Sequence, residues 1–146
     1  GRTARALLRE LAFDGTVINV DLSRRMLEVG QATMPEPLRS RTSWLRAPIA
    51  RLPFDDDAFD AVVCLEALEF VPDLDAALSE ALRVLRPGGQ LLITHRIGWN
   101  ARLILGRYLS RDALSRKLTA LPLRAIRTER WQVEYDLIWA NKERVA

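Results

Sequence analysis

Asp21 is the residue whose type and position suggest the most specific chemistry. It directly follows residues 16–20, a short apolar stretch typical of a strand, and it lies 20 positions after Gly1. An acidic residue at that place in a nucleotide-binding fold accepts hydrogen bonds from both hydroxyls of an adenosine ribose. The alternative is a structural role, in which the dipole of the following helix favours the carboxylate. The spacing alone does not separate a nicotinamide enzyme from other adenosine-binding proteins.

Three other side chains are weak candidates for proton transfer. His95 is the only histidine and ends a predicted strand, where an ordinary imidazole pKa would suit a general base, while Glu66 and Glu69 lie just past the preceding strand. In the alternative interpretation His95 hydrogen-bonds a loop and both glutamates are solvated. Cys64 has no base or metal ligand beside it in the sequence, which favours a small core residue over a nucleophile.

A strand–helix–strand unit over residues 52–94 must position these side chains. Residues 61–65 and 90–94 are short apolar runs typical of buried parallel strands, and Pro87, Gly88 and Gly89 open the second run. Between the runs, apolar residues recur on one face of a helix: Leu74, Leu78, Ala81, Leu82 and Leu85. Such a helix covers the sheet and carries the chain back in the right-handed sense.

The flanking segments extend this unit. On the N-terminal side we expect a helix over residues 4–12, a strand over 16–20, a short helix from Ser23 to Gly30, a loop at the prolines of 31–38, and a strand over 42–45. On the C-terminal side we expect helices over 99–109 and 111–120, the second capped by Ser110, and an antiparallel strand pair over 124–131 and 133–140. The predicted fold class is α/β, a Rossmann-like open, mostly parallel sheet with helices on both faces and an antiparallel C-terminal edge hairpin.

Composition limits the classes of protein that fit. The 146 residues suit one domain, no apolar run approaches the roughly 18 residues of a membrane span, and the single cysteine excludes a disulfide framework, so we expect a cytoplasmic protein without stable membrane insertion. The net charge of +3 comes from 22 basic and 19 acidic residues. Nucleic acid is not the favoured partner, because neither a basic run nor an RNA-binding aromatic motif is present. The sequence indicates no oligomeric state.

Two motifs in the central unit resemble a known family. Residues 52–60 read LPFDDDAFD and residues 80–89 read EALRVLRPGG, and together they resemble the LPF...FD and RVLRPGG branch of the class I S-adenosylmethionine-dependent methyltransferases. The resemblance covers about residues 1–95, with VDLS at 20–23 in the expected place. Residues 135–140, YDLIWA, resemble the family's last strand.

The resemblance implies S-adenosylmethionine as cofactor and assigns roles to individual residues. Asp21 would bind the ribose hydroxyls, Leu22 and Met26 would pack near the adenine, and the Ile49 backbone N–H would face the adenine ring. The backbone of Cys64 would face the methionine end of the cofactor. The implied cofactor-binding residues are Gly1, Asp21, Leu22, Met26, Ile49, Cys64 and Leu65, and no metal is implied.

The sequence departs from the family pattern at two places. Pro48 stands where relatives have an acidic residue for the adenine amino group, so adenine recognition would depend more on backbone atoms. The family's first strand and most of its glycine-rich loop are absent, because Gly1 matches the last glycine of that loop. That strand would be the central one of the sheet, and unpaired buried backbone groups cost about 1–3 kcal/mol each. We therefore expect residues 1–146 to be a single, N-terminally truncated domain, with a variable substrate-cap region over 97–123.

The function expected from this resemblance is transfer of a methyl group to a small-molecule acceptor by in-line displacement, in which the protein aligns donor and acceptor. The alternatives are a non-catalytic remnant of such a domain and a nicotinamide-dependent oxidoreductase. The second is disfavoured because no Tyr-x-x-x-Lys pair is recognisable. Three arginines on or after the predicted helix over 99–109, Arg102, Arg107 and Arg111, could bind an anionic acceptor or lipid head groups.

Overall fold

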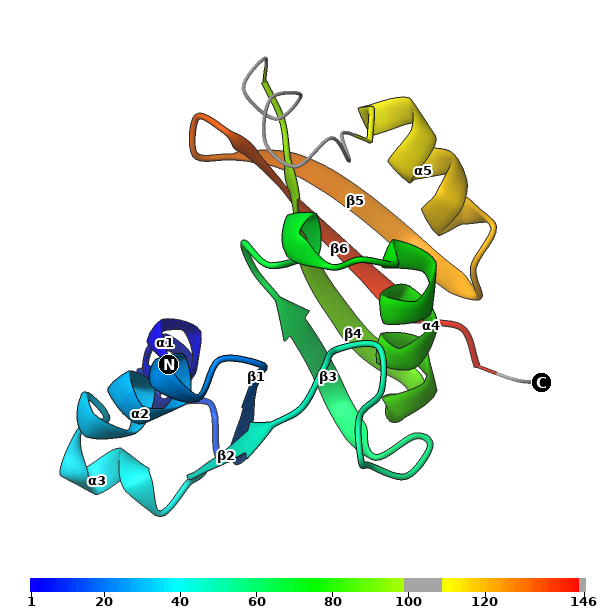
Figure 1. Ribbon diagram of the computed structural model, residues 1–146. Coiled ribbons are helices and arrows are strands. Elements are labelled where there is room, and N and C mark those ends of the chain that lie inside the picture. The colour runs from blue at the N-terminus through cyan, green and yellow to red at the C-terminus, as the bar shows by residue number, and fades with distance from the viewer. Residues whose placement is uncertain (99–108, 145–146) are drawn as a thin grey trace. The chain divides into compact units, whose positions relative to one another are not determined.

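The computed structural model describes residues 1–98 and 109–144, which fall into two compact units (Figure 1). Unit 1 is Gly1–Pro53 and unit 2 is Phe54–Ala146. Each unit contains its own sheet and its own helices. Among the helices in the described residues, none is long and apolar enough to cross a membrane.

Unit 1 is built on two parallel strands. The elements run α1 (Arg2–Arg9), β1 (Val17–Asp21), α2 (Arg24–Ala32), α3 (Glu36–Arg39) and β2 (Thr42–Arg46). Strands β1 and β2 pair from Val17 opposite Thr42 to Asp21 opposite Arg46, so the pairing reaches the predicted ribose-binding acid. The predicted strands at 16–20 and 42–45 are confirmed.

The helices of unit 1 differ from the sequence prediction at three places. The helix predicted over residues 4–12 begins earlier and ends earlier, since α1 covers Arg2–Arg9. Ser23 caps α2 as expected, its hydroxyl accepting the Met26 N–H at 3.3 Å, but the helix runs past Gly30 to Ala32. Gly30 is there for packing rather than termination, because a Cβ at this position would lie 2.3 Å from the Trp44 ring. The predicted loop over 31–38 is partly wrong, since α3 begins at Glu36 and accommodates Pro37 in its first turn, where a missing N–H costs nothing.

Unit 2 contains a four-stranded mixed sheet. Its elements are β3 (Phe59–Cys64), the short 3₁₀ helix η1 (Leu68–Phe70), α4 (Leu74–Val84), β4 (Leu85–Arg96), α5 (Arg111–Thr119), β5 (Leu123–Trp131) and β6 (Tyr135–Lys142). The strand order is β3-β4-β6-β5, with β3 parallel to β4 and the other two pairings antiparallel. The predicted central unit and the C-terminal edge hairpin are both confirmed, and the fold class is α/β as expected.

One face of this sheet carries the core of unit 2. Helix α4 packs on β4 and α5 packs on β5, and an ion pair between Lys117 and Asp75 joins the two helices (Figure 1). The buried apolar residues include the predicted face of α4 and the sheet residues beneath it: Ala77, Leu78, Ala81, Leu82, Leu85, Leu91, Ile93 and Ile138. Ser110 caps α5 as predicted, accepting the Ala113 N–H at 3.2 Å. The helix predicted over 99–109 lies outside the described residues except for Leu109.

Strand β4 begins earlier than predicted. Leu85 already pairs with Phe59, and the register then shifts so that Ala61 pairs with Gln90. The three residues expected to open the strand therefore form a bulge within it, where Gly88 has a φ of +78° that favours glycine. A Cβ at Gly89 would lie 2.8 Å from the Arg86 carbonyl oxygen, so this position also needs glycine.

Candidate functional site

Polar side chains gather at the carboxyl ends of β3 and β4 in unit 2. Because β6 is antiparallel to β4, its first residues reach the same edge, with Tyr135 opposite Arg96 and Asp136 opposite His95. Ligands of open α/β sheets bind at such an edge. The sequence separation of these residues hides their proximity, since β6 starts 39 residues after β4 ends.

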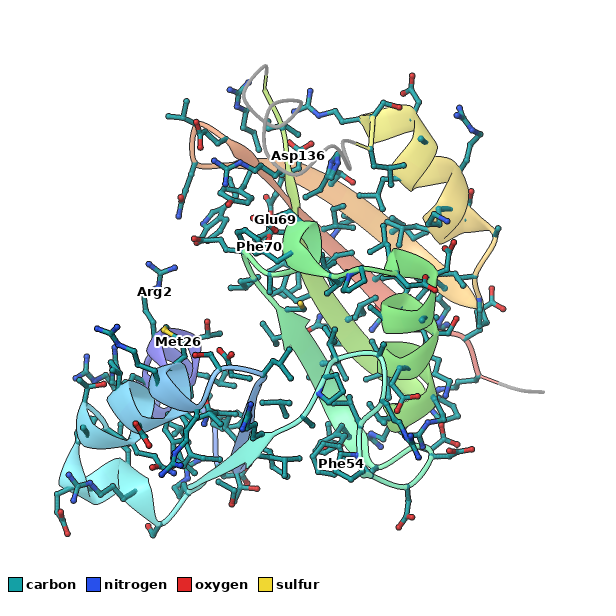
Figure 2. All side chains as sticks on the ribbon, viewed as in Figure 1. Arg2, Met26, Phe54, Glu69, Phe70 and Asp136 are labelled. Atoms are coloured by element: carbon teal, nitrogen blue, oxygen red, sulfur yellow. The ribbon has the colours of Figure 1, made fainter. Side chains whose placement is uncertain are left out.

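Glu69 lies at the centre of this edge, as Figure 2 shows. Its side chain is only 13% exposed, and its Oε1 accepts a hydrogen bond from the Tyr135 hydroxyl at 2.7 Å. Arg96 donates to the same hydroxyl at 3.1 Å and to the Glu134 carboxylate at 2.9 Å. The alternative in which both glutamates are solvated is therefore wrong for Glu69, because the chain after β3 turns back onto the sheet.

The segment between β3 and η1 has a defined backbone. Glu66 adopts a φ of +54°, and its N–H donates to the Thr94 hydroxyl at 2.7 Å. Thr94 is 1% exposed, so this bond fixes the loop to the core of β4. Leu65, which precedes Glu66, is half-buried directly after the strand.

Cys64 ends β3 and is buried. Burial, and after it the charge of Glu69, raises the pKa of its thiol to about 12. The thiol therefore stays protonated at neutral pH and is a poor nucleophile, in agreement with the small core residue that the sequence favours.

His95 faces the residues that lead into α5. Its Nε2 donates to the Leu109 carbonyl oxygen at 2.8 Å, since that oxygen can only accept. Burial lowers the pKa of His95, opposed by that hydrogen bond and by the charge of Asp136, so the ring is neutral at pH 7. This is the loop contact of the alternative interpretation.

Arg111 is paired rather than open to an anionic acceptor. Its guanidinium donates to both carboxylate oxygens of Asp136, at 2.5 and 2.7 Å, and the Asp136 side chain is only 2% exposed (Figure 2). The charge of Arg111 is thus neutralised by an acid that the sequence did not suggest as its partner. Arg102 and Arg107 lie outside the described residues.

In unit 1, the residues predicted to contact the adenosine cluster after β1. Asp21 Oδ1 accepts the Ser23 N–H at 2.8 Å, which is a contact expected for the alternative, structural role at the start of the helix. Leu22 and Met26 expose 62% and 55% of their surface. Arg46 donates to the Leu22 carbonyl at 2.9 Å and fixes the backbone there.

The remaining predicted residues of unit 1 are Gly1 and Ile49. Gly1 caps α1, and a Cβ there would lie 2.9 Å from the Trp44 ring. Ile49 lies in a turn after β2 that the Arg51 N–H closes on the Pro48 carbonyl at 3.1 Å.

Comparison with known proteins decides the family. A family model of the methyltransferase domain matches residues 1–93, which is more than half of the chain. The chain belongs to this family of methyltransferases. The resemblance seen in the motifs of the central unit is thereby confirmed.

Curated relatives of this methyltransferase domain are similar over the same region. The chain is 38% identical over 90 residues to the ubiquinone/menaquinone biosynthesis C-methyltransferase UbiE of Idiomarina loihiensis, and the match covers 58% of this chain and 34% of that protein. It is 40% identical over 88 residues to the demethylmenaquinone methyltransferase of Lactiplantibacillus plantarum, covering 60% of this chain and 37% of that protein. The chain thus spans about a third of the length of these relatives.

Solved structures share the fold of this methyltransferase domain. The methyltransferase crystallised with the Haloferax volcanii Trm112 activator aligns with a TM-score of 0.83 at 18% identity, covering 100% of this chain and 79% of that one. The geranyl diphosphate C-methyltransferase of Streptomyces coelicolor, solved with S-adenosyl-L-homocysteine, aligns with a TM-score of 0.72 at 18% identity, covering 89% and 63%.

Sequence reasoning missed Tyr135, which belongs to the unit 2 site. Its hydroxyl donates to Glu69 and accepts a hydrogen bond from Arg96, yet it did not stand out as a candidate. Tyr135 opens the segment that resembles the family's last strand, and this position was the one available signal. The predicted residues fall into both units, with Gly1, Asp21, Leu22, Met26 and Ile49 in unit 1 and Cys64, Leu65, Glu66, Glu69 and His95 in unit 2.

Proposed function

We propose that the chain forms part of an enzyme that transfers a methyl group from S-adenosylmethionine to a small-molecule acceptor. The single observation that carries this proposal is the family match over residues 1–93, which includes the acid at the end of β1. The cofactor supplies a methyl group on a positively charged sulfur that is poised for in-line displacement. The task of the protein is then to hold donor and acceptor in line and to exclude water.

The residues of unit 1 fit the adenosine part of this cofactor. Asp21 ends β1 at the carboxyl edge, and the exposed Leu22 and Met26 offer apolar surface for an adenine ring. Ile49 would contribute its backbone N–H, since the neighbouring Pro48 offers no side-chain acceptor. We propose the cofactor-binding set as Gly1, Asp21, Leu22, Met26, Ile49, Cys64 and Leu65.

The names of the relatives suggest a first acceptor to test. They include a demethylmenaquinone methyltransferase and a human 2-methoxy-6-polyprenyl-1,4-benzoquinol methylase, which is 39% identical over 77 residues. We propose a quinol-type acceptor on this basis. A general base from His95, Glu66 or Glu69 stays a prediction, needed only for a weakly acidic acceptor.

We further propose that the working domain includes a strand before Gly1. Two observations support this: the chain spans about a third of its relatives, and among the described residues β1 pairs with β2 alone and β3 with β4 alone. A strand carrying the missing glycine-rich loop would give an edge strand such as β1 a second partner. The non-catalytic remnant is the alternative if no such strand exists.

Calorimetry with S-adenosylhomocysteine tests the proposal. We expect binding to a version extended upstream, and a loss of affinity of about tenfold or more in its Asp21→Asn variant, which exchanges a charged acceptor for a neutral amide. The matched control is Asp112→Asn, an exposed acid in the first turn of α5. Absence of binding to the extended protein, or equal losses in both variants, would contradict the proposed cofactor site.

A further inference from the structure

We propose that the Glu69 carboxylate makes this domain bind S-adenosylmethionine more tightly than the product S-adenosylhomocysteine. The inference rests on the proposed function, which places the methionine end of the cofactor beside Cys64. The two molecules differ by one methyl group and one positive charge, that of the sulfonium. A negative charge near the sulfur therefore distinguishes them by electrostatics.

Glu69 is a charge held away from solvent. Its side chain is 13% exposed, and Oε1 is fixed by the Tyr135 hydroxyl at 2.7 Å. Burial and the Glu69 hydrogen bond raise the pKa of Tyr135 to about 12, so the phenol stays a neutral donor. Oε2 is buried and has no hydrogen-bond partner among the described residues. A carboxylate in this setting is weakly screened by water and salt, so its field acts over a longer range.

The charge of Glu69 is only partly balanced by the cation next to it. Arg96 Nη1 lies 3.9 Å from Glu69 Oε1, whereas Arg96 Nη2 lies 2.9 Å from Glu134 Oε2. One guanidinium therefore serves two carboxylates, which leaves a net charge of −1 on the three side chains. Arg96 is also held in place by a cation–π contact, in which its guanidinium carbon lies over the Tyr135 ring at 5.5 Å from the ring centroid.

The field of Glu69 reaches the place where the cofactor sulfur is proposed to lie. Glu69 belongs to η1, on the segment that leaves the end of β3 at Cys64. The pKa of the buried Cys64 thiol is raised mainly by burial and secondly by the charge of Glu69, so this carboxylate acts on the end of β3. A sulfonium bound beside the end of β3 would lie close to the same carboxylate.

This arrangement acts on binding and release rather than on the chemical step. During transfer the carbon–sulfur bond breaks and its electron pair stays on sulfur, which becomes neutral. The acceptor supplies the electron pair of the new bond to carbon and gives up a proton to solvent or a base. Glu69 therefore attracts the charged reactant and has no charge to attract in the product thioether. Because this attraction weakens as the charge leaves sulfur, it favours the bound reactant over the transition state and does not accelerate transfer.

Calorimetry with both molecules tests this inference, using the upstream-extended protein and its variants Glu69→Gln, Arg96→Gln and the exposed control Glu143→Gln. A unit charge about 10 Å away at an effective dielectric constant of about 20 changes an affinity about tenfold. We expect Glu69→Gln to lower the preference for S-adenosylmethionine by about that factor, Arg96→Gln to raise it, and Glu143→Gln to leave it unchanged.

The opposite signs separate an electrostatic role from a structural one, since general damage to the site would weaken both molecules equally. Equal losses of both affinities in Glu69→Gln and Arg96→Gln would overturn the inference. If circular dichroism shows that Glu69→Gln does not fold, Arg96→Gln alone decides, and an unchanged or lowered preference overturns it. If the upstream-extended protein binds neither molecule, the proposed function fails, whereas binding of both with an unchanged preference in Glu69→Gln overturns this inference alone.

Discussion

Gly30→Ala tests whether packing against Trp44, rather than helix termination, explains the glycine in α2. On an exposed helix surface this substitution would stabilise by about 1 kcal/mol, because alanine is the better helix former. Here the new Cβ would lie 2.3 Å from Trp44 Cζ3 and 2.6 Å from Cη2. Ordinary carbon contacts are about 3.5–4.0 Å, so the indole must move by more than about 1 Å.

The expected net effect of Gly30→Ala is a loss of stability. Overpacking costs about 1–3 kcal/mol, and an overlap this large at two atoms of a rigid ring belongs at the upper end. Subtracting the gain in helix propensity leaves a loss of about 1–2 kcal/mol in the free energy of unfolding. Urea denaturation followed by far-ultraviolet circular dichroism measures this quantity.

Two further variants make the Gly30 test specific. Gln31→Ala, an exposed neighbour in the same helix, is the control and should change stability by less than about 0.5 kcal/mol. Trp44→Phe removes the outer ring atoms that cause the clash, so in that background Gly30→Ala should be neutral or stabilising. A Gly30→Ala protein as stable as the parent in the Trp44 background would refute the packing explanation.

Two other predictions concern buried ionisable groups of unit 2. Arg111→Met leaves the buried Asp136 carboxylate without its partner. Breaking a buried ion pair costs about 3–5 kcal/mol, but Arg111 is 56% exposed, so we expect the free energy of unfolding in urea to fall by about 2 kcal/mol. Adding Asp136→Leu should recover part of this loss, because it removes the unpaired charge. A loss below about 0.5 kcal/mol would show that the pair is not needed. Burial lowers the folded-state pKa of His95, so the unfolded chain takes up a proton at this residue before the folded chain does as the pH falls. The contribution of neutral His95 to folding stability is therefore complete above about pH 6.5 and is lost as the pH falls through the folded-state pKa. In thermal unfolding at several pH values, the Tm of His95→Gln should fall less toward acid pH than the Tm of the parent. Identical pH profiles would contradict the lowered pKa of His95.

The parts of the fold that follow from local sequence were predictable. Ser23 and Ser110 were recognised as helix caps because the cap hydrogen bond spans only three residues. The C-terminal hairpin was recognised because a short connection permits only antiparallel pairing. The β4 start and the continuation of α2 through Gly30 were not predictable, because each depends on a contact with a distant segment, Phe59 in one case and Trp44 in the other.

The candidate site was predictable only in its location. Glu69 was identified from its position after a strand, but its burial depends on Tyr135, which lies 66 residues away in the sequence. The pairing of Arg111 with Asp136 depends in the same way on the register of β6. Hydrogen bonds between side chains on different strands leave no periodicity in the sequence, so a one-dimensional pattern cannot reveal them.

The motifs that identify the family are mainly structural in this domain. Arg83 of the EALRVLRPGG segment donates to the Phe54 carbonyl at 2.8 Å and to Asp56 at 2.7 Å, and thereby ties α4 to the LPFDDDAFD segment. Lys142 on β6 donates to Asp57 at 2.6 Å and to the Leu85 carbonyl at 2.7 Å, which joins the same acidic loop to the last strand. The residues that make the domain recognisable therefore hold its scaffold together, at the opposite end of the strands from Glu69. The charge selection proposed at the cofactor sulfur depends in addition on Arg96 and Tyr135, which lie outside the residues 1–93 that match the family model.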